Sequence, residues 1–86
     1  MSTRTHELKT WPYYFAAVER GDKPFEVREN DRGYVVGDTL FLREWDAHCS
    51  EYTGRSCLRK VTFVLGGGLL GIADGYVALG LGEVST

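Results

Sequence analysis

One helix-like segment is followed by a series of strand-like segments, and this order restricts the chain to a small sheet with a single helix. A helix is expected from about Pro12 to Arg20, because Trp11, Phe15 and Val18, with Tyr14 alongside, form an apolar stripe at three- and four-residue spacing. Gly21 follows, and glycine favours the left-handed conformation at a helix end. Beyond it, short runs rich in β-branched and aromatic residues alternate with turn residues.

About five strands are expected. Residues 5–10 form either a first strand or an extended arm, with His6, Leu8 and Thr10 on one face. Further strands are expected at 24–29, 39–45, 55–65 and 76–81, with turns or loops at 30–33, 36–38, 46–54 and 66–71. In the 55–65 strand, one face is expected to carry Cys57, Val61, Phe63 and Leu65. The fold class is therefore mainly β (α+β), a small barrel with one helix packed against it.

Length and charge bound the class of protein. The 86 residues predict a single domain over 1–86 with a core from about 5 to 82. A content of 43% hydrophobic and 26% charged residues is ordinary for a globular domain. The net charge of −2 argues against broad, non-specific nucleic-acid binding. All ten Lys and Arg lie between Arg4 and Lys60, so any basic surface must come from that part of the chain.

Cysteine usage and hydropathy predict a cytoplasmic protein. Residues 1–7 are polar and lack the pattern of a secretory leader, and no apolar run approaches membrane-spanning length. Cys49 and Cys57 are expected as free thiols, although a bridge across a hairpin stays open. Together with Asp46 and His48 they match no closed zinc pattern, so no metal is predicted.

The run Gly66-Gly67-Gly68-Leu69-Leu70-Gly71 fits the glycine spacing of dinucleotide-binding loops. That motif requires a helix immediately afterwards and an acidic residue about twenty positions further on. Here Asp74-Gly75 and a strand-like segment follow instead. We therefore expect an inter-strand loop and no cofactor.

Lys23, Glu26 and Arg28 form the most distinctive polar cluster. On the 24–29 strand, Phe25 and Val27 point one way while Glu26 and Arg28 point the other. Strict alternation places Lys23 and Glu26 on opposite faces unless the strand begins late or bulges at Pro24. If they converge, they form a potential acid–base pair; the alternative, favoured from the residues alone, is an ordinary surface ion pair.

Charged and aromatic residues also gather where the helix begins. His6 and Lys9 precede Trp11 and Pro12, and the free N–H groups of a helix start attract anions. Lys9 is placed to assist, unless it is simply solvated. For Trp11 we favour a position in the core over a role as a stacking platform.

Several of these blocks in order resemble a family of small bacterial and phage proteins in the ASCH group of the PUA-like superfamily. The resemblance spans about residues 6–81. It rests on the blocks His6-Glu7-Leu8-Lys9-Thr10-Trp11-Pro12, Tyr14-Phe15, Gly21-x-Lys23-x-x-Glu26-x-Arg28-x-Asn30-Asp31-Arg32, Val36-Gly37-Asp38, Glu44-Trp45 and Gly75-Tyr76-Val77.

The resemblance implies a β-barrel with a cleft between barrel and helix, and a role in RNA binding or modified-base recognition. One ASCH branch consists of acetylcytidine amidohydrolases, which use the signature lysine, a threonine three residues on and a distant glutamate. Lys23 matches that lysine, but Glu26 stands where those enzymes have threonine. Pro24 is a second departure, and the motif does not place the distant acid.

The sequence and the resemblance together predict a module that recognises RNA, a nucleotide or a modified base. The candidate ligand-binding residues are His6, Lys9, Trp11, Lys23, Glu26, Arg28, Asn30, Arg32, Trp45 and Tyr76. A hydrolase of acylated nucleosides, with Lys23 and Glu26 as its catalytic residues, is one alternative. A phage-type module that binds or inhibits another protein is the other.

Overall fold

A computed structural model describes residues 3–84 of the chain. The polar N-terminal stretch considered above begins with Met1 and Ser2, which lie outside this range. The elements follow in the order β1 (Thr5–Thr10), α1 (Pro12–Glu19), β2 (Phe25–Glu29), β3 (Thr39–Asp46), β4 (Glu51–Gly66) and β5 (Tyr76–Gly82). The segment 5–10 is thus a strand, and the single expected helix forms with Pro12 in its first turn.

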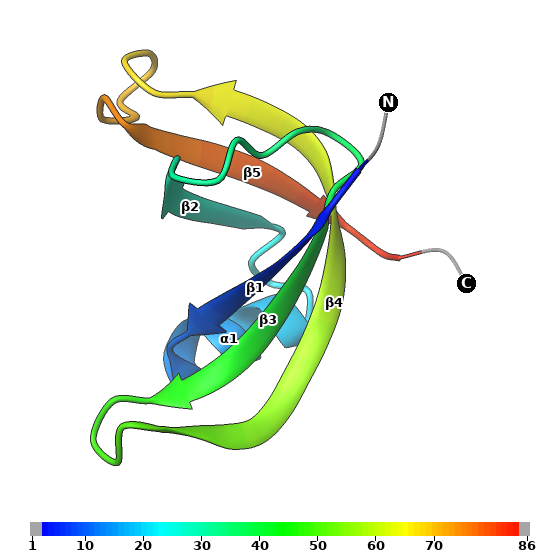
Figure 1. The fold of residues 1–86 in the computed structure, drawn as a ribbon, viewed down its shortest axis with the longest axis vertical. Coiled ribbons are helices and arrows are strands. Elements are labelled where there is room, and N and C mark those ends of the chain that lie inside the picture. The colour runs from blue at the N-terminus through cyan, green and yellow to red at the C-terminus, as the bar shows by residue number, and fades with distance from the viewer. Residues whose placement is uncertain (1–2, 85–86) are drawn as a thin grey trace.

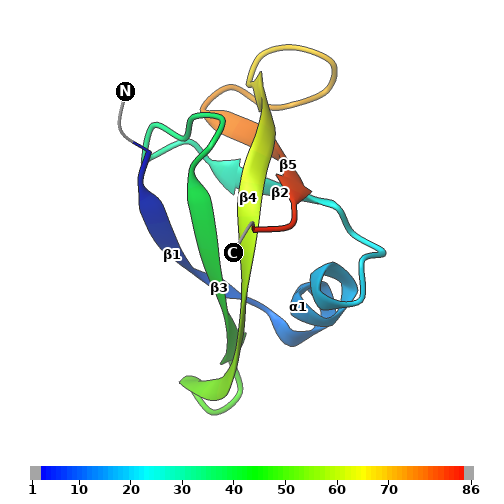
Figure 2. The same cartoon turned by 90° about the vertical axis from the view of Figure 1, so that its right-hand side faces the viewer.

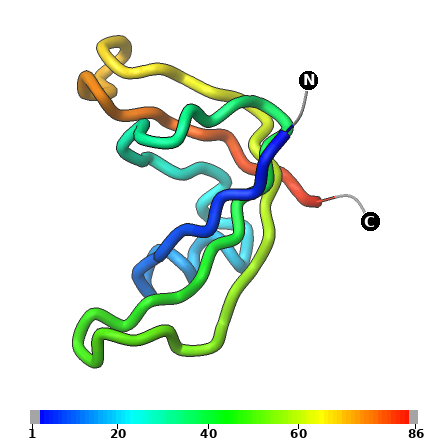
Figure 3. Tube along the Cα trace, in the orientation of Figure 1, coloured from blue at the N-terminus to red at the C-terminus, as the bar shows by residue number. Residues whose placement is uncertain are grey.

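The five strands form one curled sheet in the order β1-β3-β4-β5-β2 (Figure 1). β1 runs parallel to β3, and the other neighbouring pairs are antiparallel. β4 pairs with β3 through residues 51–60 and with β5 through residues 60–66. The long, bent β4 therefore joins two arms of the sheet, which Figure 3 shows diverging along the chain trace. The result is a half-barrel with one helix, as the mainly β (α+β) prediction requires.

The core lies on the concave side of this half-barrel. Leu8 on β1, Leu40 and Leu42 on β3, and Val77 and Leu79 on β5 are at most 3% exposed. Alternate residues of a strand point to opposite faces, which explains why His6, Leu8 and Thr10 are buried while Thr5, Glu7 and Lys9 are exposed. The face predicted for the first strand is confirmed.

The helix contributes only part of the predicted apolar stripe to this core. Phe15 and Val18 are buried, at 0% and 2% exposure, whereas Trp11 is 60% exposed. The expectation that Trp11 belongs to the core is therefore wrong. Arg59 on β4 contacts the C-terminal end of the helix, where its Nη2 donates a hydrogen bond to the Val18 carbonyl oxygen at 3.2 Å. Gly21 ends the helix with a φ of +89°, as expected.

The strand predicted at 55–65 begins earlier and bulges. β4 starts at Glu51, so Gly54 lies within it and the connection to β3 shortens to residues 47–50. A register shift between Val61 and Phe63 inserts an extra residue, which moves the following side chains to the opposite face. Val61 is fully buried and Phe63 is 62% exposed. The prediction that these two residues share a face is wrong.

Residues 30–38 connect β2 to β3 and are fastened by the carboxylate of Asp38. This side chain is fully buried and accepts hydrogen bonds from the His6 ring at 2.8 Å, the Arg4 N–H at 2.9 Å and the Val35 N–H at 3.1 Å. Tyr34 packs edge-on against His6, with ring centres 4.7 Å apart. His6 is therefore part of a buried polar cluster that ties β1 to this connection.

Because of this buried cluster, we expect the protein to lose stability in acid. Burial alone would raise the pKa of Asp38, but the hydrogen bonds from Arg4, His6 and Val35 outweigh it and lower the pKa below 3.8. A depressed folded-state pKa stabilises the fold above the unfolded-state value, and this contribution is lost as the pH falls through the folded-state pKa. Urea unfolding of the wild type should therefore show a falling free energy of unfolding below about pH 4, the ordinary range of an Asp carboxyl.

The Asp38→Asn variant isolates this effect. It should be less stable than the wild type at pH 7 and approach it in acid, because the variant has no carboxyl to titrate at this position. If the free energies of unfolding of the two proteins changed in parallel from pH 7 to pH 3, the Asp38 carboxylate would not be the source of the pH dependence.

Candidate functional site

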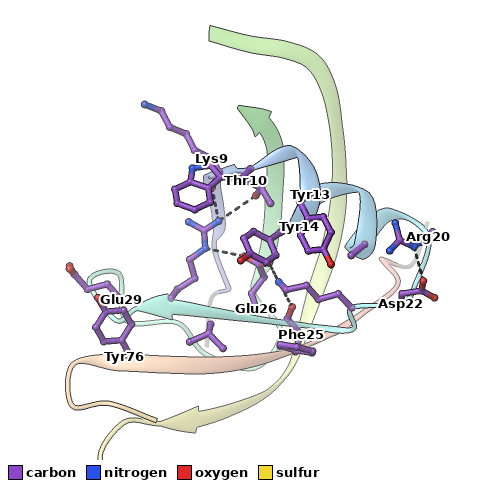
Figure 4. A pocket seen from close by; sticks show the side chains of 15 residues that line it. Lys9, Thr10, Tyr13, Tyr14, Arg20, Asp22, Phe25, Glu26, Glu29 and Tyr76 are labelled. Atoms are coloured by element: carbon purple, nitrogen blue, oxygen red, sulfur yellow. Dashed lines mark hydrogen bonds and ion pairs between the residues drawn. The ribbon is translucent and has the colours of Figure 1, made fainter. Parts of the chain in front are cut away.

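A cleft of about 860 Å³ opens between α1, the end of β1 and strand β2 (Figure 4). Arg20 and Asp22 lie toward one end of it, where the helix leads into β2, and Glu29 and Tyr76 lie toward the other. The volume is in the range of pockets that hold small organic ligands. Helix and sheet thus form a cleft between them, which the resemblance implied.

Glu26 occupies the floor of the cleft and holds two cations. The residue is only 3% exposed. Its Oε1 accepts a hydrogen bond from Lys23 Nζ at 2.5 Å, and its Oε2 accepts one from Arg28 Nε at 3.0 Å. The side chains of Lys23 and Arg28 are 17% and 24% exposed. The buried carboxylate therefore fixes two positive groups that still reach the solvent in the cleft.

Lys23 meets Glu26 because it is not part of the strand. Its N–H still donates to the carbonyl oxygen of Ala17 on the helix, at 3.0 Å, and β2 begins only at Phe25. Alternation along a strand does not apply to Lys23, so its side chain can turn back over β2. Nζ also donates to the Phe25 carbonyl oxygen at 3.0 Å. The convergence that the sequence left open is present in the structure.

Arg28 bridges the two edges of the sheet. β2 and β1 are its outermost strands, so each has backbone groups that no neighbouring strand pairs. The Nη2 of Arg28 donates to the carbonyl oxygen of Lys9 on β1 at 2.7 Å and lies 3.3 Å from the Thr10 hydroxyl. One side chain thus closes the half-barrel across its open side and simultaneously lines the cleft.

Aromatic side chains form the walls. Trp11 and Tyr14 stack on the helix side with ring centres 6.2 Å apart and planes 28° from parallel. Phe25 on β2 and Tyr76 on β5 are 46% and 45% exposed. The ammonium of Lys23 lies between helix and strand, 5.5 Å from the Tyr14 ring centre and 5.1 Å from that of Phe25. Two flat π surfaces, those of Tyr14 and Phe25, therefore lie close to the ammonium of Lys23.

The cleft is more basic than the chain as a whole. It is lined by four cationic residues, Lys9, Arg20, Lys23 and Arg28, and by three acidic ones, Asp22, Glu26 and Glu29, while the chain carries a net charge of −2. Such a site suits a ligand that combines an aromatic ring with a negative charge.

The structure brings together six of the ten candidate ligand-binding residues. Lys9, Trp11, Lys23, Glu26, Arg28 and Tyr76 line the cleft. Of the others, His6 is buried against Asp38, and Asn30 and Arg32 lie in the connection after β2. Trp45 is on the outer side of β3, beneath the ammonium of Lys9. The structure places these residues; their roles in binding stay predictions.

Sequence reasoning did not select several cleft residues. Tyr13, Tyr14 and Phe25 line the cleft, as do Thr10, Arg20 and Asp22. The sequence contained a signal for the two helix residues, because Tyr13 lies outside the apolar stripe and Tyr14 only borders it. Aromatic residues on the solvent side of an amphipathic helix are unusual enough to mark a candidate contact surface.

The remaining motifs have structural explanations. Within residues 3–84, no group of three or more His, Cys, Asp or Glu side chains gathers to hold a metal ion. Cys49 and Cys57 are free, and burial raises the pKa of the Cys57 thiol. The glycine-rich run leads from the last residue of β4 into the β4–β5 connection, where a Cβ atom at Gly67 would lie 2.3 Å from the Ala73 carbonyl oxygen. Its glycine is required by this close backbone approach.

The curled sheet and its helix-walled cleft define a small half-barrel domain. The chain belongs to the family described as "Domain of unknown function (DUF3850)", whose pattern matches residues 5–81. It is also 41% identical over 64 residues to the "Uncharacterized 12.9 kDa protein in GpA 3'region" of Escherichia phage P2. The matched region covers 74% of this chain and 57% of that relative, so the chain spans little more than half of the relative's length. No helix within residues 3–84 is long and apolar enough to cross a membrane.

Proposed function

We propose that the cleft binds a nucleotide or an unstacked RNA base. The observation that carries this proposal is the pair of cations, Lys23 and Arg28, anchored by the buried carboxylate of Glu26 between exposed aromatic rings. Bases stack on aromatic side chains, and phosphates bind to Arg and Lys. The resemblance to the ASCH group of the PUA-like superfamily, which is associated with RNA and modified bases, supports the same ligand class.

Each part of the cleft has a distinct task in this proposal. Tyr14 and Phe25 flank the base, with Trp11 extending the stacking surface on the helix side. Lys23 and Arg28 donate hydrogen bonds to the phosphate or to acceptor atoms of the base, and Glu26 acts mainly as their positioning residue because both of its oxygens are already bonded. Because few cations take part, the affinity should depend only weakly on salt concentration.

Removal of either cation should weaken nucleotide binding. Hydrogen bonds from charged groups contribute roughly 1.5–3 kcal/mol each, so Lys23→Ala or Arg28→Ala should raise the dissociation constant at least about tenfold. The measurement is calorimetric titration with the four ribonucleoside monophosphates and with acetylcytidine. Lys60→Ala is the matched control, since this exposed lysine of β4 lies outside the cleft lining. Unchanged affinity in both cleft variants would contradict the proposal.

A second candidate, hydrolysis of an acylated nucleoside, is favoured by the 2.5 Å contact between Lys23 Nζ and Glu26 Oε1. In this scheme Glu26 takes a proton from water as the water oxygen bonds to the acyl carbon. The C–N bond then breaks, the departing amine takes a proton from Lys23, and Glu26 returns a proton to Lys23 as the carboxylic acid leaves. Mass spectrometry of acetylcytidine incubated with the wild type and with Lys23→Ala tests it. Deacetylation by the wild type but not by Lys23→Ala would support the hydrolase. Intact acetylcytidine after incubation with either protein would exclude hydrolysis of this substrate.

A further inference from the structure

A second cluster of cations and aromatic rings lies outside the cleft, on the outer face of β1, β3 and β4. The ammonium of Lys9 lies 4.0 Å from the ring centre of Trp45, and the guanidinium carbon of Arg43 lies 3.6 Å from that of Tyr52. The rings of Trp45 and Tyr52 meet edge-on with centres 4.9 Å apart. We refer to Lys9, Arg43, Trp45 and Tyr52 as the outer cluster.

Strand pairing explains why these side chains share one surface. Lys9 is the register partner of Arg43, and Trp45 is the partner of Tyr52. Along β3, Leu40, Leu42 and Glu44 are buried. Because successive side chains of a strand point to opposite faces, Arg43 and Trp45 point to the outer face. Figure 2 shows β1, β3 and β4 side by side. Three neighbouring strands thus place two rings and two cations on one surface, with a shift in the β3–β4 register between Arg43 and Trp45.

The outer cluster is continuous with the cleft through Lys9. Lys9 lines the cleft and also contacts Trp45, and Trp11 follows it by two residues at the start of α1. In Figure 4 the side chain of Lys9 extends away from Glu26 and the cleft floor. A ligand longer than one nucleotide can therefore extend from the cleft along Lys9 to the outer cluster.

We propose that the outer cluster is a second subsite, which binds the nucleotides next to the one in the cleft, so that the ligand is a single-stranded nucleic acid. This inference rests on the proposed nucleotide binding in the cleft and deepens it. Open sheet faces that combine rings with cations suit single strands, because bases stack on the rings or on Arg planes while phosphates bind the cations.

The contacts within the cluster indicate how each residue would take part. Arg43 is held by Glu7, whose Oε2 accepts from its Nη1 at 2.9 Å, and its side chain is 33% exposed. A base can stack on the outer plane of this fixed guanidinium. Lys9 is exposed and can turn from Trp45 to a phosphate, which frees the indole face for a second base.

The test compares single nucleotides with short strands. Fluorescence or calorimetric titrations would use AMP, CMP and UMP, the hexanucleotides of A, C and U, and the corresponding DNA hexanucleotides. For the wild type we expect at least one hexanucleotide to bind about tenfold more tightly than its mononucleotide, with a salt slope steeper by roughly 0.7 for each added phosphate contact. Comparison of the RNA and DNA hexanucleotides shows which of the two nucleic acids the protein prefers.

Variants then locate the additional affinity. Trp45→Ala and Arg43→Gln should each remove most of the tenfold gain, the size expected for a lost stacking contact, while mononucleotide affinity stays within about twofold. Leu70→Ala is the control, because Leu70 is an 86% exposed apolar side chain in the β4–β5 connection, outside the cleft lining and the outer cluster. Circular dichroism would confirm folding, and Arg43→Gln keeps the test valid if Trp45→Ala fails to fold.

The outcomes separate this inference from the proposed function. Mononucleotide binding without a gain for any hexanucleotide would overturn the second subsite and leave the cleft proposal in place. A gain that persists in both variants would also overturn it. Failure of every ligand to bind would overturn the proposed function and the second subsite with it. Hexanucleotide binding that depends on Trp45 and Arg43, without mononucleotide binding, would support the outer cluster and contradict the cleft.

Discussion

The Glu26→Gln variant is expected to be markedly less stable than the wild type and to lose affinity for nucleotides. The substitution keeps the shape of the side chain but removes the charge that Lys23 and Arg28 share. Removing one partner of a fully buried ion pair costs about 3–5 kcal/mol. Because Lys23 and Arg28 are 17% and 24% exposed, we expect a smaller loss, about 2–3 kcal/mol, in urea unfolding at pH 7.

Glu29→Gln is the matched control for this prediction. Glu29 belongs to the same strand and also lines the cleft, but it is exposed and joins no ion pair within residues 3–84. Its substitution should change the free energy of unfolding by less than about 0.5 kcal/mol. Equal stability of the Glu26 and Glu29 variants would show that the Glu26 carboxylate does not hold the cleft together.

The Phe15→Ala variant is expected to lose a large part of the fold's stability. Phe15 is the main side chain by which α1 enters the core, and it is fully buried. Phe-to-Ala substitutions in cores cost about 3–5 kcal/mol, against a total of about 5–10 kcal/mol for a domain of this size. Thermal and urea unfolding followed by circular dichroism would measure the loss.

Tyr13→Ala serves as the control on the same helix. Tyr13 is 78% exposed, so its removal should leave the midpoint of unfolding nearly unchanged. If Phe15→Ala lowered the free energy of unfolding by less than 1 kcal/mol, α1 would not be anchored in the core as the structure describes.

The elements that were predictable are those governed by local pattern. The helix from Pro12 has the expected start, and Gly21 ends it because its φ of +89° suits glycine. Strand β1 buries His6, Leu8 and Thr10 as its two-residue period predicts. The 66–71 segment leads from the end of β4 into the β4–β5 connection, in agreement with the expected inter-strand loop. Local periodicity and turn chemistry were sufficient for each of these features.

The errors arise where tertiary pairing overrides local pattern. Strand alternation predicts Phe63 on the same face as Val61, but the bulge between them adds one residue and reverses the alternation. The large apolar side chain of Trp11 favours a position in the core. Phe15 and Val18 fill the space beneath α1, so Trp11 stays exposed and stacks on Tyr14 instead. The position of a bulge and the choice of side chains that fill the core depend on tertiary contacts, so the local sequence pattern does not predict them.

The candidate site was only partly predictable for a related reason. Lys23, Glu26 and Arg28 stand out in the sequence because they are close together, but their convergence depends on Lys23 remaining attached to the helix end through its bond to Ala17. The contact of Arg28 with Lys9 joins residues 19 positions apart. The cleft and its aromatic walls likewise result from the curl of the sheet, which sets β2 opposite the end of β1.

The most direct test of the central claim is a nuclear magnetic resonance titration of the ¹⁵N-labelled wild type with the four ribonucleoside monophosphates. We predict saturable shifts of amide signals at Tyr14, Lys23, Phe25, Glu26 and Arg28, with the signal of Lys60, which is outside the cleft lining, unchanged. Shifts confined to residues outside the cleft, or no shift at millimolar nucleotide, would contradict nucleotide recognition by the cleft.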